Sequence, residues 1–361
     1  MTSSQRVLTA LAHREPDRVP VDFWAVPETK QRLLASLGLE TEEDLLSYLD
    51  VDLRYVLGPS FVGQQRRVWP DGSIEDLWGV RRAAVTVQGT GYSWTYKEVV
   101  HSPLGKALSV ADIETYPGWP SPDWWSYGAI ADECERHASY AVVSAGDRLD
   151  RTAQLKPAMY LRGMEQFLMD LALEPELTEA IIEHIVDYYL EYNRRVFTAA
   201  RGKIDVFMMG DDFGTQNGPM VSLDMWRRYF RQGFRRYCDL AHQYGMKVMH
   251  HTCGSVRYLI PDLIDCGLDV LQSLQPRARD MDLADLKREF GHDLCFHGAI
   301  DIQETMPRGR PEDVRAEVAA RMADGKPGGG FIICTAHNIL PDVPVENILT
   351  LYEACREYGC Y

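Results

Sequence analysis

The sequence predicts an α/β protein whose chain forms a (β/α)8 TIM barrel, with a small β-meander inserted after the second strand. Short apolar, β-branched runs recur eight times along the 361 residues, and amphipathic helical patterns lie between them. No Gly-x-Gly-x-x-Gly motif follows a strand and no phosphate-loop motif occurs. This disfavours the nucleotide-binding form of a doubly wound open sheet, which is the alternative fold. We expect residues 1–361 to form a single domain.

The predicted strands are short, and most of them end beside polar residues. The first follows the turn-like Glu15-Pro16-Asp17, and the second has the weakest pattern. The eight strands are expected at residues 19–24, 53–57, 140–145, 204–209, 247–252, 268–274, 294–300 and 331–336.

The segments between these strands carry helix signals. Ser222 is a typical N-cap and Gly245 a typical C-terminal stop for the helix between them. Pro311 fits the first turn of another helix, since proline lacks an N–H that would be unpaired there anyway. The clearest helices are expected at residues 177–201, 223–244, 256–266 and 311–323.

Residues 62–120 interrupt the alternation of strands and helices. Turn signals at Pro70-Asp71-Gly72 and Gly89-Thr90-Gly91 separate β-rich pieces, which predicts the inserted β-meander. A segment rich in proline and tryptophan follows and contains Trp119, Trp124 and Trp125. We favour packing between helix and barrel for these rings over the lining of a ligand pocket.

Composition excludes several classes of function. A formal net charge of -15 makes phosphate-mediated binding to nucleic acid unfavourable and gives no reason for attachment to an anionic membrane. Residues 1–11 lack a signal-peptide core, and no run approaches the roughly 20 apolar residues of a membrane-spanning helix. The eight cysteines do not resemble a disulfide framework. We therefore expect a cytoplasmic protein that acts on a small molecule.

Polar side chains gather where the last five predicted strands end, which is the face that carries the active site in barrels of this class. We assign proton transfer to Asp211, Asp212 and His337, and cofactor contacts to Gln216, Asn217 and Gln275. The two aspartates also suit helix capping. Three others have structural explanations: His250 points away from the site, His297 suits the core, and Asp301 suits an N-cap.

His251 and Cys253 predict a metal site. On an extended strand, residues i and i+2 point to the same side, so one strand end offers an imidazole nitrogen and a thiolate to one ion. Catalytic zinc usually takes three protein ligands and keeps one open position. Cys334 and His337 both stand near the last strand, and either can supply the third ligand. Such zinc either binds a substrate thiol as thiolate, which this soft donor set favours, or activates water.

The chain resembles the uroporphyrinogen decarboxylase family in its broad sense, which includes zinc-dependent, corrinoid-linked methyltransferases. The resemblance is strongest around Asp211-Asp212-Phe213-Gly214-Thr215-Gln216 and His251-Thr252-Cys253-Gly254-Ser255. Further matching segments are His13-Arg14-Glu15-Pro16-Asp17-Arg18-Val19-Pro20, Leu161-Arg162-Gly163, Ile260-Pro261-Asp262-Leu263-Ile264, Gly329-Gly330-Phe331 and His337-Asn338-Ile339-Leu340-Pro341. It implies a (β/α)8 barrel that often pairs as a homodimer.

Within that family the methyltransferases are more similar to this chain than the decarboxylases. Their His-x-Cys zinc pair matches His251 and Cys253, while the position of their third ligand, a cysteine, falls on His337. The arginine-rich substrate loop and the Phe-Ser-Asp motif of the decarboxylases have no match. The resemblance implies methyl transfer between a corrinoid carrier, as co-substrate or on a partner protein, and a thiol or pterin-type acceptor. The alternatives are a metal-free decarboxylase-like lyase on a smaller acid and a non-catalytic corrinoid- or tetrapyrrole-binding protein.

Overall fold

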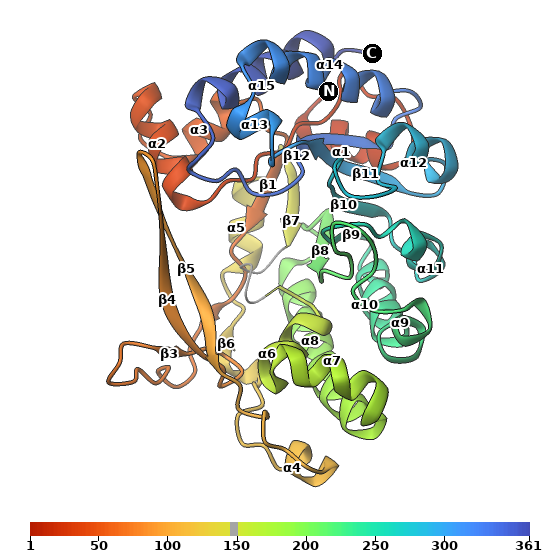
Figure 1. Ribbon diagram of the computed structural model, residues 1–361. Helices are drawn as coiled ribbons and strands as arrows, with labels where there is room; N and C mark the ends of the chain where they lie inside the picture. The colour runs from red at the N-terminus through yellow and green to blue at the C-terminus, as the bar shows by residue number, and fades with distance from the viewer. Residues whose placement is uncertain (145–150) are drawn as a thin grey trace.

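The centre of the molecule is a curved sheet of seven parallel strands. The computed structural model describes residues 1–144 and 151–361, and the strands follow the order β1-β7-β8-β9-β10-β11-β12. Figure 1 shows helices arranged around the outside of this sheet. The strands are β1 (Leu53–Val56), β7 (Ala141–Ser144), β8 (Val206–Gly210), β9 (Lys247–His251), β10 (Val270–Leu274), β11 (Cys295–Ile300) and β12 (Phe331–Thr335).

Seven of the eight predicted strands are confirmed by this sheet. Every residue of β7, β8, β10, β11 and β12 is buried, because side chains on both faces of these strands are covered. Parallel strands covered on both faces read as continuous apolar runs, which is the signal that the sequence carries. Ala145, the last residue of the third predicted strand, lies outside the described residues.

The first predicted strand, residues 19–24, does not form a regular strand. Its central residues nevertheless bond to both edges of the sheet. The N–H of Ile333 in β12 donates to the carbonyl of Pro20 at 2.9 Å. The N–H of Asp52, just before β1, donates to the carbonyl of Val21 at 2.8 Å. Pro20 has no N–H to continue a ladder, which limits the pairing to an isolated bridge between Val21 and Ile333.

The helices differ from the predictions mainly at their ends. The long helix expected at 223–244 is two helices, which meet at Phe230, and the one expected at 256–266 begins as a short 3-10 turn. The helices are α1 (Ser3–Leu11), α2 (Pro27–Leu37), α3 (Glu42–Tyr48), α4 (Val110–Glu114), α5 (Ile130–Arg136), α6 (Leu155–Arg162), α7 (Met164–Leu173), α8 (Pro175–Ala200), α9 (Leu223–Tyr229), α10 (Arg231–Gln243), α11 (Ile260–Asp265), α12 (Leu283–Phe290), α13 (Thr305–Arg308), α14 (Pro311–Gly325) and α15 (Val345–Tyr358), with 3-10 turns η1 (Pro122–Trp124) and η2 (Arg257–Leu259). Within the described part of the chain, none of them is long and apolar enough to cross a membrane.

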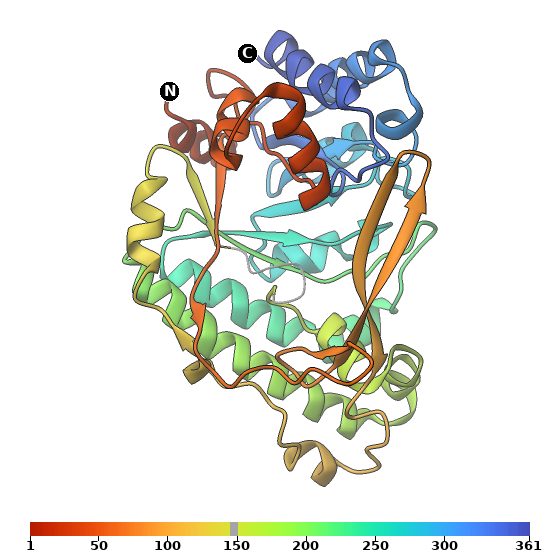
Figure 2. The same ribbon diagram turned by 90° about the vertical axis from the view of Figure 1, so that its left-hand side faces the viewer.

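The β-rich segment after β1 forms a separate antiparallel sheet. Strands β3 (Ile74–Glu75), β4 (Arg81–Gly89) and β5 (Tyr92–His101) pair in that order, and the long β4–β5 hairpin stands apart from the central sheet in Figures 1 and 2. Two short strands, β2 (Ser60–Phe61) and β6 (Trp125–Ser126), pair beside it. Trp119 stacks on His184 of α8 at 4.4 Å between ring centroids, as expected for packing against a helix.

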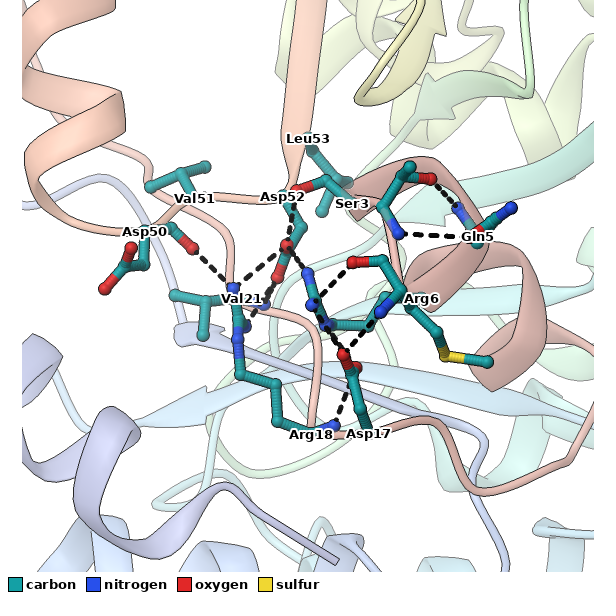
Figure 3. A network of polar contacts seen from close by, with 12 residues as sticks. Ser3, Gln5, Arg6, Asp17, Arg18, Val21, Asp50, Val51, Asp52 and Leu53 are labelled. Atoms are coloured by element: carbon teal, nitrogen blue, oxygen red, sulfur yellow. Dashed lines mark hydrogen bonds and ion pairs between the residues drawn. The ribbon is translucent and has the colours of Figure 1, made fainter.

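A buried ionic network ties the N-terminal segment to the start of β1 (Figure 3). The carboxylate of Asp52, whose side chain is 0% exposed, accepts hydrogen bonds from Arg6 at 2.6 Å and from Arg18 at 2.7 Å. The Ser3 hydroxyl and the Val21 N–H also donate to it, so the charge is fully compensated. The network holds the segment before residue 20 against the sheet, and with it the residues that bridge β12 and β1.

Candidate metal centre

Three side chains from two strand ends converge on one point. His251 is the last residue of β9, Cys253 follows it by two positions, and His337 lies two residues beyond β12. One potential ligand atom from each lies within 4.8 Å of the others. The Nε2 atom of His251 and the Sγ atom of Cys253 are 3.4 Å apart. The extended backbone at the end of β9 therefore presents the two side chains to the same side, as its period of two requires.

The ring of His251 is held in one orientation by its neighbours. Gln272 in β10 stands beside His251 in the parallel register, and its Oε1 atom accepts a hydrogen bond from Nδ1. A neutral imidazole that donates from Nδ1 keeps a lone pair on Nε2, the nitrogen beside Cys253. Trp24 stacks on the ring at 5.7 Å between centroids with an interplanar angle of 21°. The His337 ring stands 5.9 Å from that of His251, edge to face.

This donor set fits a zinc ion. Two imidazole nitrogens and one sulfur, on side chains that are buried or half-buried, match the ligand types and the number that catalytic zinc takes from a protein. Burial raises the pKa of the Cys253 thiol to about 12, and it lowers the pKa of His251 well below its usual range. Both shifts follow from the loss of water around a charged form, which a bound cation would offset for the thiolate.

Asp212 belongs to the same cluster. Its carboxylate lies 3.6 Å from Nε2 of His251, pairs with the Lys156 ammonium at 2.5 Å and accepts the N–H of Cys253 at 2.9 Å. Burial acts to raise the pKa of Asp212, but attraction to the Lys156 ammonium, together with the hydrogen bonds from Lys156 and from the Cys253 N–H, outweighs it, so the pKa lies well below its usual range. Asp212 is therefore an ionised group that orients the Cys253 backbone.

Asp211 has a different position from its neighbour. Its carboxylate accepts the N–H groups of Gln154, Leu155 and Lys156, so it caps the start of α6. Burial raises its pKa to about 6 against the opposing effect of these three hydrogen bonds. Capping is the alternative that the sequence left open for this residue, and the Asp211 carboxylate makes that contact.

The three residues expected to contact a cofactor lie in loops around the cluster. Gln275 accepts the N–H of Gly254, which fixes the turn after Cys253. Gln216 donates to the carbonyl of Arg277 at 2.6 Å, and exposed Asn217 donates its backbone N–H to the Thr215 hydroxyl at 3.3 Å. The structure thus brings Gln275 next to the turn after Cys253 and gives Gln216 a loop-to-loop contact.

Cys334 lies in a second buried group. Its sulfur gathers with Asp22 and His297, one atom from each within 4.8 Å of the others. Asp22 accepts a hydrogen bond from the Tyr55 hydroxyl at 2.6 Å and lies 2.8 Å from Nε2 of His297. Burial raises the pKa of Cys334 well above its usual range. Of the two candidates for the third ligand, His337 is the one that stands beside His251 and Cys253.

The sequence did not single out Lys156, Asp22, Tyr55 or Trp24. All four residues precede β9 in the sequence, far from His251 and His337. Only the folded chain brings them to the site. Gln272 is a further functional candidate whose role only the structure identifies, through its contact with His251. One signal was available for it, since Gln272 aligns with His251 once β9 and β10 are paired in parallel.

Comparison with known proteins places these features in a family. The profile of the uroporphyrinogen decarboxylase (URO-D) family matches residues 152–358. The methylated-thiol–coenzyme M methyltransferase of Methanosarcina mazei is 23% identical over 206 residues, which are 57% of this chain and 52% of that protein. The methylcobamide:CoM methyltransferase of Methanosarcina barkeri is 25% identical over 154 residues, 43% of this chain and 42% of that protein. The matched region thus spans about half the length of these curated relatives or less.

The fold has a counterpart among solved structures. A methyltransferase from Methanosarcina mazei superposes with a TM-score of 0.68 and 17% identity, covering 99% of this chain and 99% of that one. At this identity the likeness concerns the fold alone. The family profile covers more than half of the 361 residues, including β8 to β12 and both strand ends of the cluster. The chain therefore belongs to the uroporphyrinogen decarboxylase family.

Proposed function

We propose that this protein is a zinc-dependent methyltransferase that moves a methyl group between a corrinoid carrier and a thiol or pterin-type acceptor. The observation that carries the proposal is the convergence of His251, Cys253 and His337 within 4.8 Å at the ends of β9 and β12. Two relatives whose names describe methyl transfer to coenzyme M support it. The corrinoid would arrive on a partner protein or as a free co-substrate.

The charge of the donor set favours a thiol as acceptor. A zinc ion held by the Cys253 thiolate and the imidazoles of His251 and His337 would keep a net positive charge, and it would supply the means to lower the pKa of a bound thiol. Methyl transfer then forms a carbon–sulfur bond and breaks the cobalt–carbon bond, whose electron pair stays on cobalt. The thiol proton leaves to solvent before this step. The reaction therefore balances without a further oxidant or reductant.

The chain's own residues would prepare the site for this step. Gln272 holds Nδ1 of His251, so that Nε2 faces the Cys253 sulfur. Asp212 fixes the Cys253 backbone through its N–H, and Lys156 compensates the carboxylate. We assign Asp212 and His337 to the reacting region, with Asp212 acting through electrostatics because its lowered pKa makes it a poor base.

We also propose that residues 1–361 form one (β/α)8 barrel domain. Residues 20–22 would occupy the position of the remaining strand between β12 and β1. They bond to β12 on one side and to Asp52, the residue just before β1, on the other. Residues 62–120, with the β4–β5 hairpin, would be an insertion after β1.

A metal-free lyase acting on a smaller carboxylic acid is the second candidate. The observation in its favour is the Lys156–Asp212 ion pair beside His251, which offers a cation for a substrate carboxylate and groups for proton transfer. This reaction would not need the Cys253 sulfur. The two candidates therefore differ in their response to zinc removal and to loss of that sulfur.

Methyl transfer from methylcobalamin to small thiols tests the proposal. Purified protein is stripped with a chelator and assayed before and after zinc addition, by the absorbance change on loss of the cobalt–carbon bond. We expect zinc to restore transfer to the wild type but not to Cys253→Ala. Cys360→Ala, which removes an exposed cysteine, is the matched control and should behave as the wild type. Full metal content and transfer in Cys253→Ala would contradict the proposal.

A further inference from the structure

We propose that Trp24 is a positioning residue that couples the two halves of the metal centre, the His251–Cys253 strand end and the loop that carries His337. The inference rests on the proposed metal site but concerns a residue outside its ligand set. Trp24 lies on the segment after residue 22, and its side chain is almost fully buried, at 9% exposed.

The first contact of Trp24 is with the His251 ring. The indole and the imidazole lie nearly parallel, 21° apart, with centroids separated by 5.7 Å. Gln272 holds the edge of the imidazole at Nδ1. A hydrogen bond at one edge leaves a ring free to rock about that bond, whereas a flat neighbour on its face restricts the rocking. Trp24 therefore sets the plane of the ligand, and Gln272 sets its rotation.

The second contact is with the His337 loop. The backbone carbonyl of Trp24 accepts the N–H of Ile339 at 2.8 Å, and the N–H of Val26 donates to the carbonyl of Ile339 at 3.2 Å. These bonds form a parallel bridge between Ala25 and Ile339, two residues beyond His337. One short segment is thereby joined to one histidine through its side chain and to the other through its backbone.

The third contact fixes the indole itself. Its Nε1–H donates to the Tyr55 hydroxyl at 2.9 Å, and that hydroxyl donates to Asp22 at 2.6 Å. Asp22 is also 2.8 Å from His297, and these last two side chains are buried. The Trp24 ring is thus anchored, through the Tyr55 hydroxyl, to a buried polar group.

This coupling matters because the two ligand-bearing strands are not neighbours. In the sheet, β10 and β11 separate β9 from β12. Contacts that orient metal ligands from outside the ligand set typically change metal affinity by about 10- to 100-fold when removed. We therefore expect loss of the Trp24 ring to weaken metal binding within this range and to change the ligand geometry.

Cobalt(II) substitution tests the inference without reference to activity. Cobalt bound by Cys253 gives a thiolate charge-transfer band and visible d–d bands that report the ligand geometry, and Cys253→Ser identifies which bands belong to this site. The variants are Trp24→Leu, which removes the flat ring, Trp24→Phe, which keeps a ring without the N–H, and Tyr55→Phe, which releases the indole anchor. Trp78→Phe is the control, since Trp78 is also buried, at 3% exposed, but packs against Tyr188.

We expect the cobalt dissociation constant to rise at least about tenfold in Trp24→Leu, with shifted d–d bands, and Trp24→Phe to recover part of both. Tyr55→Phe should shift the bands with a smaller loss of affinity. The control should lower thermal stability without moving the bands. Wild-type affinity and bands in Trp24→Leu would overturn the inference. If that variant does not fold, unchanged bands in both Trp24→Phe and Tyr55→Phe would do so. A wild type without a thiolate band would instead contradict the proposed function and remove the basis of the inference.

Discussion

At the scale of single residues, the chemistry of the candidate centre depends on which nitrogen of His251 faces the cluster. The Gln272 carbonyl oxygen decides this, because it can only accept a hydrogen bond and so requires the proton on Nδ1. Sequence reasoning located His251 and Cys253 from their spacing alone. It could not rank His337 above Cys334, because both lie near the end of β12 and only the path of the loop separates them.

The Gln272 contact gives a prediction about affinity. Gln272→Leu removes the acceptor at Nδ1, and we expect zinc affinity to fall about 10- to 100-fold while the fold is retained. Gln272→Glu keeps an oxygen acceptor at the same place and should hold most of the affinity. Competition with a chromogenic chelator measures both. Equal affinities in Gln272→Leu and wild type would show that the contact does not orient the ligand.

At the scale of elements, the loop after β8 and the loop after β9 meet backbone to backbone at Gly214 and Gly254, next to Cys253. Gly254 has a φ of +85°, and a Cβ placed there would lie 2.6 Å from the backbone carbon of Gly214 in the neighbouring loop. Glycine at both positions therefore permits a close approach that another residue would prevent. The sequence shows the glycines after Asp211-Asp212 and after His251-Thr252-Cys253, but their mutual contact appears only in the structure.

This close approach predicts a sensitive position. Gly254→Ala should destabilise the protein by about 1–3 kcal/mol through backbone strain and should weaken zinc binding by moving Cys253. Urea unfolding and zinc titration measure the two effects. Gly218→Ala, in the same region but with open space around the added methyl group, is the control and should change neither. Unchanged stability in Gly254→Ala would contradict the role of the contact.

The Asp52 network predicts a large effect on stability. Asp52→Asn removes the charge that compensates Arg6 and Arg18, and we expect a loss of about 3–5 kcal/mol in the free energy of unfolding. Asp50→Asn is a matched control, because Asp50 is about half exposed and pairs with Arg356 at the surface, where ion pairs contribute little. Similar unfolding curves for the two variants would exclude an anchoring role for Asp52.

Asp17, which also pairs with Arg6, predicts that the stability of the protein depends on pH. Its hydrogen bond with Arg6 holds the pKa of Asp17 well below its usual range in the folded state. The folded carboxylate therefore stays ionised when the unfolded one, with a pKa of about 3.9, takes up a proton. Its stabilisation is present above about pH 4 and is lost as the pH falls below that value.

For a partly exposed pair this stabilisation amounts to about 1 kcal/mol or less. The stability difference between wild type and Asp17→Asn, measured by urea unfolding, should accordingly shrink from about pH 6 to pH 3. A difference that stays constant over this interval would contradict the assignment.

At the scale of the whole molecule, apolar patterning predicted most of the sheet. Strands β1 and β7 to β12 are short buried runs, so their signal is local. The first predicted strand failed to form a ladder because Pro20 interrupts it, although residues 20–22 lie in the expected place between β12 and β1. The hydrogen bonds that link Trp24, Tyr55, Asp22 and His297 form only when residues 20–24 pack against the sheet. Local patterns carry no record of such contacts between distant segments.

The most direct test of the central claim is the zinc content of His337→Ala and Cys334→Ala, compared with the wild type. Each protein is saturated with zinc, freed of excess metal by gel filtration and measured by mass spectrometry of the metal, with circular dichroism to verify folding. We predict that the wild type and Cys334→Ala keep one zinc per chain at the His251 site and that His337→Ala loses it. Retention of zinc by His337→Ala together with its loss from Cys334→Ala would contradict the proposed ligand set.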